Sequence, residues 1–388
     1  MPQKELPRIL YLSDVPVELS SAGATLLYRL LEHYQKDKLV IIQGVSVNEK
    51  QNRIAGVQYH VLKSKLERLK YTRFAKYTRG LFLATGFLNS GKTKKILQSF
   101  QPDIILTVSI GLMWLNAFRL SKQFNIPLYL ILHDDWLITE RYGKWQKYLE
   151  YIFGEMYHHA SERFCISPNM ENYYFSLYGV HGKVIYPLRG KEDHIFPINI
   201  ERKRSQRGLK FCYAGSLFTG DFAVMLDMIA YNIGKQGGEL HIFSYWNKEI
   251  LSQYTNLKEK FVIFHPFMHS AELMRTMNEE MDVAILLNSY IFEEPFRYNF
   301  SSKLVDYISA GLPVMFWGPA TSGSISWALS LKYDAIVTRQ DSKLIANLMK
   351  EFYNDEKRLN WARMIRELGM KEFSYEQNAG TFIKAISS

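Results

Sequence analysis

Residues 293–314 read EEPFRYNFSSKLVDYISAGLPV, and the order of residue types in this stretch is typical of a loop, a helix and a buried strand. Ser301 and Ser302 come just before the apolar positions of the expected helix. Gly311 suits the left-handed conformation that commonly ends a helix, and Pro313 is tolerated at the start of a strand. The stretch therefore predicts a helix–turn–strand unit of an α/β domain.

The same stretch brings together groups that bind phosphate and ribose. Arg297 and Lys303 are cations on either side of the two serines, and the free N–H groups of a helix start attract anions. Asp306 follows Ser302 by one helical turn, so its carboxylate can accept hydrogen bonds from ribose hydroxyls. The alternative is an ordinary amphipathic helix whose polar face meets solvent. We interpret the stretch as part of a nucleotide site.

Short apolar runs alternate with amphipathic stretches on both sides of this unit. Continuous apolar runs suit parallel strands that are buried on both faces. In the second half of the chain, strands are expected at residues 209–214, 239–244, 260–264, 281–287 and 313–316. In the first half, they are expected at residues 8–13, 39–43, 103–108 and 127–132. The alternation predicts parallel sheets with right-handed crossovers.

The 388 residues are enough for two domains, each with its own core. We expect two doubly wound, Rossmann-like domains that face a central cleft, with ligands beyond the carboxyl ends of the strands. The predicted domains are an N-terminal, acceptor-side domain at residues 1–190 and a donor domain at 208–365. A helix at 366–388 is predicted to pack back on the first domain.

Composition sets limits on the class of protein. Cys165 and Cys212 are distant from each other in apolar runs, which supports neither a disulfide framework nor a zinc site. The first residues do not resemble a signal peptide, and the longest nearly apolar run, 104–118, is shorter than a bilayer crossing requires. We expect a cytoplasmic protein, soluble or peripheral on a membrane.

Ionisable residues follow the strand expected at 127–132. His133, Asp134 and Asp135 lie where a parallel sheet presents its site, and burying such groups without a purpose is costly. His133 can contact a sugar or a leaving phosphate, and either carboxylate can orient or deprotonate an acceptor hydroxyl. A capped turn, with an aspartate as the N-cap of a helix, is the alternative. We take the three residues as candidate catalytic groups.

Two glycine-containing turns are further candidates. Gly23 opens the helix expected after the first strand, where a phosphate could approach the backbone closely. Gly215 and Ser216 begin a small loop before another helix, and the amides of such a loop can bind a diphosphate. Both can equally be simple turns.

Together these motifs resemble the family-4 glycosyltransferases. The segment SSKLVDYISAGLPV looks like the donor-binding segment of that family, and His133-Asp134 matches its strand-end His-Asp pair. Gly23 lies where the family has its first glycine-rich loop. YAGSL, at residues 213–217, matches the first strand of its donor domain, and FHPFMHSAEL, at 264–273, its base-contacting loop. The motifs occur in the family's order over most of residues 8–330.

The resemblance implies a GT-B fold and a hexosyltransferase that retains the anomeric configuration, without metal or other cofactor. The donor is a nucleotide sugar, a substrate whose diphosphate is neutralised by cations and helix dipoles. His265, Pro266 and Phe267 are expected to line the base. The full set of expected donor-binding residues is Gly23, Gly215, Ser216, Tyr245, His265, Pro266, Phe267, Arg297, Tyr298, Asn299, Ser301, Ser302, Lys303 and Asp306.

The chain departs from the family pattern at three positions. An arginine and a lysine in the loop after YAG, and the first of two spaced carboxylates, are replaced. The residues found there are Ser216, Gly220 or Asp221, and Tyr298. We infer that Arg297 and Lys303 take over phosphate binding. Because these cations are missing, a second interpretation stays open: a GT-B-like protein that binds a nucleotide sugar without transferring it.

A third interpretation comes from residues 86–93, GFLNSGKT, which satisfy the Walker A pattern. If these residues connect a strand to a helix, the protein would be an ATPase or kinase. The pattern is short, and the residues that follow are more typical of a helix leading into a sheet strand. We therefore rank this interpretation below the glycosyltransferase.

The net charge of +10 favours anionic partners. Residues 63–79, KSKLERLKYTRFAKYTR, combine seven cations with apolar positions near helical spacing. Such a helix can lie on an anionic membrane, or it can face the core with its charges solvated. Membrane docking would suit an acceptor that is linked to a lipid, as in surface polysaccharide or glycolipid assembly. The alternative acceptor is a saccharide without a lipid. No nucleic-acid-binding module is found, so we expect no nucleic-acid partner.

Overall fold

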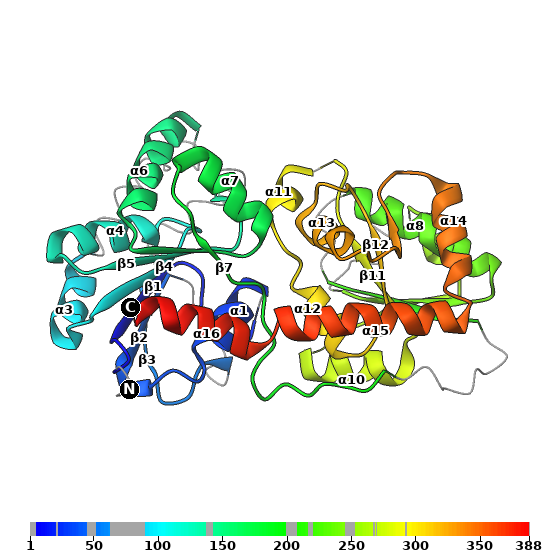
Figure 1. Cartoon of the computed structure of the whole chain (residues 1–388), viewed down its shortest axis with the longest axis horizontal. Coiled ribbons are helices and arrows are strands. Elements are labelled where there is room, and N and C mark those ends of the chain that lie inside the picture. Colours follow the sequence, from blue (N-terminus) through cyan, green and yellow to red (C-terminus); the bar gives the residue numbers. More distant parts are fainter. Residues whose placement is uncertain are drawn as a thin grey trace. The chain divides into compact units, whose positions relative to one another are not determined.

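The computed structural model describes residues 5–20, 22–44, 52–62, 90–136, 143–198, 208–215, 220–244, 253–266, 268, 270–291 and 293–387. The chain divides into two compact units (Figure 1). The first unit comprises Met1–Gly190 and Tyr375–Ser388, and the second comprises Lys191–Ser374. Each unit contains one sheet.

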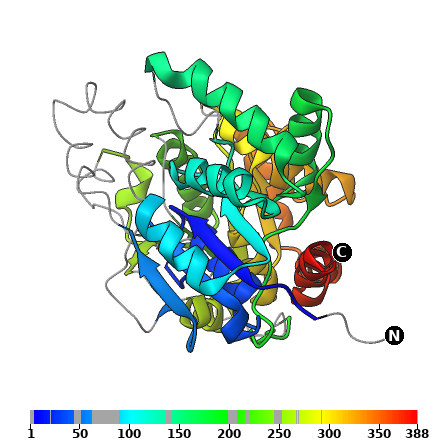
Figure 2. The same cartoon turned by 90° about the vertical axis from the view of Figure 1, so that its left-hand side faces the viewer.

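The described part of the first unit has a seven-stranded sheet in which neighbouring strands are parallel and follow the order β3-β2-β1-β4-β5-β6-β7. Every residue of β1, β2, β4 and β5 is buried, because helices cover both faces of a doubly wound sheet. In Figure 2 the blue strands run side by side. The strands are β1 (Ile9–Ser13), β2 (Leu39–Gln43), β3 (Gln58–Val61), β4 (Ile104–Val108), β5 (Leu128–Leu132), β6 (Glu162–Cys165) and β7 (Lys183–Val184).

The helices of the first unit connect these strands. They are α1 (Ala22–Leu31), α3 (Ser90–Phe100), α4 (Met113–Phe124), α6 (Gln146–His159), α7 (Pro168–Tyr178) and α16 (Tyr375–Ile386). Their ends follow from the local sequence. In α7, for example, the Ser167 hydroxyl accepts a hydrogen bond from the Met170 amide, Pro168 occupies the first turn, and Gly179 ends the helix with φ +67°.

The C-terminal helix packs on the first unit, as the sequence predicted. Helix α16 contacts α1 and β6, and the ring of Phe382 lies 5.3 Å from that of Phe164. The Asn378 side chain accepts a hydrogen bond from the Tyr186 amide. The segment that returns is shorter than the range 366–388, because α15 continues to Glu372 within the second unit.

The described part of the second unit has a six-stranded parallel sheet with the order β10-β9-β8-β11-β12-β13. Its strands are β8 (Lys210–Ala214), β9 (Glu239–Phe243), β10 (Val262–His265), β11 (Val283–Leu287), β12 (Val314–Trp317) and β13 (Ile336–Val337). Its helices are α8 (Gly220–Lys235), α10 (Ser270–Glu280), α11 (Glu293–Tyr298), α12 (Lys303–Ser309), α13 (Gly323–Ser330), α14 (Ser342–Glu351) and α15 (Asp355–Glu372). Two parallel-sheet, Rossmann-like units confirm the predicted α/β fold class.

The stretch at residues 293–314 forms α11, α12 and the turn into β12. Gly311 has φ +74°, the left-handed conformation predicted for the helix end, and a Cβ there would lie 2.7 Å from the Pro197 carbonyl oxygen. The expected loop at its start is wrong in part, because Glu293–Tyr298 is helical. An acidic first turn followed four residues later by Arg297 stabilises that short helix.

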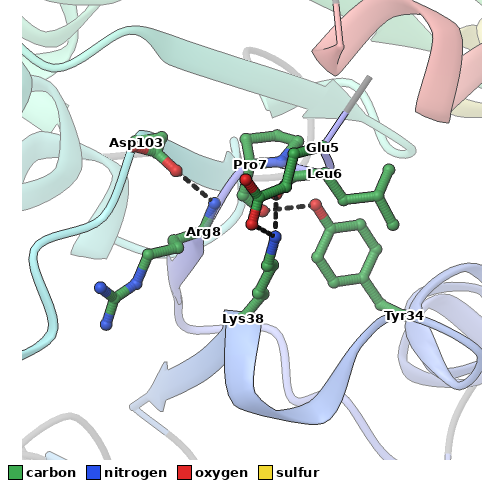
Figure 3. A network of polar contacts seen from close by, with 7 residues as sticks. All are labelled: Glu5, Leu6, Pro7, Arg8, Tyr34, Lys38 and Asp103. Atoms are coloured by element: carbon green, nitrogen blue, oxygen red, sulfur yellow. Dashed lines mark hydrogen bonds and ion pairs between the residues drawn. The ribbon is translucent and has the colours of Figure 1, made fainter. Parts of the chain in front are cut away.

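Each sheet reverses its strand order at one place, between β1 and β4 in the first unit and between β8 and β11 in the second. Open α/β sheets bind ligands at the carboxyl ends of the strands beside such a reversal. At the amino ends of β1, β2 and β4, the N-terminal segment is held by hydrogen bonds and an ion pair (Figure 3). There the Arg8 amide donates to Asp103 at 2.7 Å, and Lys38 Nζ bonds Glu5 at 2.6 Å.

Candidate functional site

Gly215, the residue directly after β8, lies against a lysine side chain. Gly215 follows the strand with φ +130°, a conformation that favours glycine. A Cβ at this position would lie 2.0 Å from Cε and 2.3 Å from Nζ of Lys303. The absence of a side chain at Gly215 therefore lets the Lys303 ammonium approach the backbone at the carboxyl end of the strand.

Lys303 is held in place by an aromatic neighbour. Its Nζ donates a hydrogen bond to the Tyr213 hydroxyl at 3.0 Å and lies 4.6 Å from the centre of the Tyr213 ring. Burial lowers the pKa of Lys303 to about 8. No carboxylate within 4.0 Å of its Nζ is found among the described residues. A poorly hydrated cation without such a partner favours an anionic ligand.

Helix α12 is fixed to β8 by a second tyrosine. The Tyr307 hydroxyl accepts a hydrogen bond from the Ala214 amide at 2.9 Å and contacts the Ala214 carbonyl at 3.3 Å. Tyr307 is fully buried. Because Lys303 begins the same helix, this contact sets the position of the ammonium relative to Gly215.

Asp306, the expected ribose ligand, is partly buried on the same helix. Its Oδ1 accepts a hydrogen bond from the Ser270 hydroxyl at 3.3 Å, and Ser270 is the first residue of α10. Lys303 and Asp306 therefore lie about one turn apart on α12, and Asp306 joins this helix to the start of α10.

Arg297 lies in different surroundings from Lys303. It is exposed on α11, and its guanidinium pairs with Glu293 at 3.2 Å. Glu293 also accepts a hydrogen bond from Thr321 at 2.5 Å. The Glu293 carboxylate raises the pKa of Arg297, and the hydrogen bonds from Thr321 and Arg297 lower the pKa of Glu293. Much of the Arg297 charge is thus balanced within its own helix.

Four other expected donor-binding residues lie at the end of α11 and in the link to α12. Tyr298, Asn299, Ser301 and Ser302 are all partly buried. The Ser301 amide donates to the Ser324 hydroxyl at 2.9 Å, and a Cβ at Gly323 would lie 2.3 Å from the Asn299 carbonyl oxygen. Ser302 precedes α12, but its hydroxyl makes no capping hydrogen bond there. Helix α13 therefore packs against this link.

His265, expected near the base, belongs to a chain of hydrogen bonds on β9 and β10. His265 Nε2 lies 2.8 Å from His241 Nδ1, and His241 Nε2 lies 3.2 Å from Glu239. The His265 ring also stacks on Phe243 at 4.2 Å. Burial lowers the pKa of both histidines, which favours neutral rings whose tautomers are set by Glu239. Pro266 is exposed just after the strand.

In the first unit, His133 lies against the start of α1. A Cβ at Gly23 would be 2.8 Å from His133 Cε1 and 2.9 Å from Nε2, so only glycine leaves room for the ring. His133 is 6% exposed, and its Nδ1 has no hydrogen-bond partner among the described residues. Burial lowers the pKa of His133, so a neutral imidazole faces this position. The two residues predicted separately are thus in contact.

The two aspartates after His133 have different environments. The Asp134 side chain is 45% exposed, and its Oδ2 lies 3.7 Å from His133 Nε2. Asp135 is 0% exposed, and its Oδ1 accepts a hydrogen bond from the buried Tyr174 hydroxyl at 2.9 Å. Asp134 is therefore the carboxylate that a substrate can reach, whereas Asp135 ties the strand end to α7.

Sequence reasoning missed two carboxylates at the strand reversals. Asp14 follows β1, and its Oδ2 accepts hydrogen bonds from the Leu112 and Met113 amides at 2.6 and 2.8 Å. Asp221, noted only for replacing a lysine, accepts from the Ser289 hydroxyl and the Tyr290 amide at 2.7 and 2.9 Å. Asp14 directly follows β1, and Asp221 lies in the first turn of α8. These positions in the sequence pattern could have identified both carboxylates.

Several predicted residues lie outside the part of the chain that the structure describes. They are Ser216, Tyr245, Phe267, the basic segment 63–79 and residues 86–89 of the Walker-like motif. The rest of that motif forms the first turn of α3, and Thr93 is 0% exposed within it. A Walker A threonine must reach a magnesium ion, so this burial does not favour the ATPase interpretation.

Two further observations concern ions and membranes. No group of three or more His, Cys, Asp or Glu side chains that could bind a metal is found among the described residues. In the same part of the chain, no helix is both long and apolar enough to cross a membrane.

Comparison with known proteins gives one family and one fold. The model of Glycosyltransferase Family 4 matches residues 46–187. No curated protein shows a significant match. Anabaena Alr3699/HepE in complex with UDP and glucose is 16% identical, with a TM-score of 0.66 over 98% of this chain and 100% of that chain. A UDP-forming trehalose-phosphate synthase from Burkholderia xenovorans, in complex with glucose-6-phosphate, is 11% identical, with a TM-score of 0.66 over the same shares.

The family and the fold found by these comparisons are those that the sequence motifs predicted. The two Rossmann-like units match GT-B structures over nearly the whole chain, so the predicted GT-B fold is confirmed. The family model confirms the resemblance to family-4 glycosyltransferases, and its match lies in the first unit. Family model and fold together point to a glycosyltransferase.

Proposed function

We propose that this chain transfers a hexose from a nucleotide-sugar donor to an acceptor hydroxyl, with retention of the anomeric configuration. The observation that carries the proposal is the Lys303 ammonium beside Gly215 at the strand reversal of the second unit. The position, the cation and the open backbone all suit a diphosphate. UDP is the first nucleotide to test, because HepE binds UDP and the trehalose-phosphate synthase forms it.

Lys303 is the group that would stabilise the leaving nucleoside diphosphate. As the bond to the sugar breaks, negative charge grows on the phosphate oxygen, and a preorganised cation lowers the energy of that transition state. The lowered pKa of Lys303, about 8, leaves it mostly charged at neutral pH. Asp306 would accept hydrogen bonds from the ribose, with Ser270 fixing its carboxylate. This chemistry needs no metal ion, and we propose none.

The first unit would supply the acceptor side. His133 is positioned by Gly23 and has one ring nitrogen available to the transferred sugar or its phosphate. Asp134 is exposed enough to orient an acceptor hydroxyl, and its neighbour His133 can share the proton. Asp135 is assigned a positioning role through Tyr174.

Assembly of a surface polysaccharide or glycolipid is the proposed setting, on the cytoplasmic side of a membrane. The net charge of +10 and the basic segment 63–79 support contact with anionic lipid. Sedimentation with vesicles containing phosphatidylglycerol, compared with phosphatidylcholine vesicles, measures this contact. Equal binding to both would contradict it.

A transfer assay tests the function itself. UDP-, GDP- and ADP-hexoses are incubated with the protein, with and without saccharide and lipid-linked acceptors, and nucleoside diphosphate release is measured. We expect one donor to be consumed faster when an acceptor is present, and proton NMR to show a product of the same anomeric configuration. Binding without turnover would instead support the non-catalytic alternative. If the protein neither binds nor turns over any donor, both the proposed transferase and the non-catalytic alternative are contradicted.

A further inference from the structure

A pocket of about 400 Å³ lies at the carboxyl end of the edge strand β3. It is lined by residues of that strand end and of the first two turns of α3. These residues are Tyr59, His60, Val61, Leu62, Lys92, Lys95 and Ile96. A larger cavity, about 510 Å³, lies instead at the amino ends of β1, β2 and β4, away from the edge where parallel sheets bind ligands.

The polar groups of the β3 pocket are basic. Lys92 and Lys95 are three residues apart on α3, so both ammonium groups lie on one face of the helix. His60 Nε2 is buried and has no hydrogen-bond partner among the described residues. No carboxylate is among the described residues that line the pocket. An imidazole with an unpartnered ring nitrogen and two lysines that line the same pocket suit an anionic hydrogen-bonding group.

One wall of the pocket is rigid. The Tyr59 hydroxyl donates to the Val17 carbonyl at 2.8 Å and accepts from the Ile54 amide at 3.1 Å. Both contacts fix the end of β3 without using the pocket's own basic groups. The site is thus partly preorganised, which reduces the entropy that a ligand must lose on binding.

We infer that this pocket binds a phosphate group of the acceptor. The inference rests on the proposed function, because it places the acceptor in the first unit. Four strand positions separate β3 from β5, which ends at His133, and at about 4.8 Å each they span about 19 Å. The acceptor therefore carries its phosphate far from the reacting hydroxyl, as in a phosphorylated oligosaccharide or a lipid-phosphate-linked saccharide.

This assignment also accounts for part of the Walker-like sequence. Gly91 has no neighbour that a Cβ would meet within 4 Å, so it is not a close-packed phosphate-loop glycine. Lys92 lines the β3 pocket, and Thr93 packs inside the unit. The motif would then bind one phosphate of an acceptor rather than the triphosphate of ATP.

The test measures phosphate binding without any donor. Inorganic phosphate is titrated by ³¹P NMR line broadening against wild type and a Lys92→Ala/Lys95→Ala variant. The matched control is Lys122→Ala/Lys144→Ala, which removes the same charge from exposed lysines of the first unit outside the pocket. We expect at least tenfold weaker binding in the pocket variant and unchanged binding in the control. Equal losses in both variants, or none in either, would overturn the inference.

His60→Gln gives a second variant without a change of formal charge. It should weaken phosphate binding severalfold at an unchanged melting temperature, and unchanged phosphate binding would count against the role of His60. Two further arms identify the source of the phosphate. Preference for phosphatidic acid over phosphatidylcholine vesicles, lost in the pocket variant alone, assigns a lipid; a phosphorylated maltooligosaccharide that competes with inorganic phosphate assigns a soluble acceptor.

UDP binding is measured in the same variants to separate this inference from the proposed function. UDP affinity should be unchanged when the β3 pocket is altered, since Lys303 lies in the second unit. If wild type binds inorganic phosphate through Lys92 and Lys95 but no nucleotide, the proposed function fails while the anion site holds. If it binds nucleotide but not phosphate, the pocket inference alone fails.

Discussion

The two units share one strand order but differ at the place where that order reverses. In the first unit, Asp14 fills this place and accepts hydrogen bonds from the first amides of α4. Gly44 and Gly111 leave room for its carboxylate, with positions for a Cβ only 2.1 and 2.2 Å from its oxygens. In the second unit, Asp221 likewise accepts hydrogen bonds from residues just after β11, but the end of β8 itself holds Gly215 and the Lys303 ammonium.

This difference supports the proposal that the two units bind different ligands. The Asp14 carboxylate satisfies amides at the start of α4 that would otherwise attract a phosphate, so this place in the first unit does not suit an anion. In the second unit, Lys303 has no carboxylate partner among the described residues, so its charge can attract an anionic ligand. On this comparison we propose that the nucleotide diphosphate binds in the second unit, and the following predictions test the proposal.

The largest effect is expected for Lys303→Ala. Removing a preorganised charge from a developing phosphate typically costs about 100-fold or more in rate, which is about 3 kcal/mol. We expect kcat/KM for the nucleotide sugar to fall by about that factor. Lys343→Ala, on the exposed face of α14 in the same unit, is the control and should leave kcat/KM unchanged.

Gly215→Ala sharpens the same prediction. The new Cβ must displace the Lys303 side chain, and the backbone conformation also becomes strained. Gly237→Ala supplies the control, because Gly237 has φ +69° but no atom within 4 Å of a Cβ. Loss of donor affinity in the Gly215 variant but not in the Gly237 variant isolates the contact with Lys303. Equal donor affinities in the two variants would remove that assignment.

The next effect concerns His133 in the first unit. His133→Ala should lower kcat about 100-fold while donor affinity measured by calorimetry changes little, since the diphosphate is assigned to the other unit. Gly23→Ala should lower kcat less, about tenfold, because its Cβ pushes the ring out of place. Gly380→Ala, in α16 with open space around it, is the matched control. A normal kcat in the Gly23 variant would contradict the positioning role.

A smaller effect is expected on stability from Asp14→Ala. Two amides of α4 would lose their acceptor, at a cost of about 2 kcal/mol. Asp341→Ala is the matched change in the second unit, where the carboxylate caps α14 through the Lys343 and Leu344 amides; about 1 kcal/mol is expected there. Urea unfolding measures both. A larger loss at Asp341 would show that Asp14 is not the tighter cap.

The smallest effect is the pH dependence of the histidine chain in the second unit. Burial lowers the folded-state pKa of His241 and His265 below 6.5, so below that pH the unfolded chain binds more protons than the folded one. Stability should fall as the pH drops from 7 to 5.5, by at most about 1.4 kcal/mol per pH unit for each group. His241→Gln should flatten the melting-temperature profile, and an unaltered slope would contradict this account.

The fold and part of the site followed from local patterns. Apolar runs and the glycine-proline turn at Gly311 predicted the parallel strands, and the basic residues after a strand identified Lys303. The pairing of Arg297 with Glu293 was not predicted, because it depends on residues 293–298 forming a helix. Asp14 was missed because its partners are 98 and 99 residues away in sequence.

Neighbouring residues after a strand also cannot be told apart by type. Asp134 and Asp135 have the same side chain, and only the fold shows that one is exposed while the other is bonded to Tyr174. The contact between His241 and His265 depends on the register of β9 and β10, which pairs Phe243 with His265. Such contacts across strands are set by tertiary packing and leave little trace in a single sequence.

A crystal structure with a bound nucleoside diphosphate tests the central claim most directly. We predict that Lys303 Nζ turns from the Tyr213 hydroxyl to a phosphate oxygen at about 2.7–3.0 Å, beside the Gly215 backbone. A diphosphate bound instead beside Asp14 or at Arg297, with Lys303 still on Tyr213, would contradict the account.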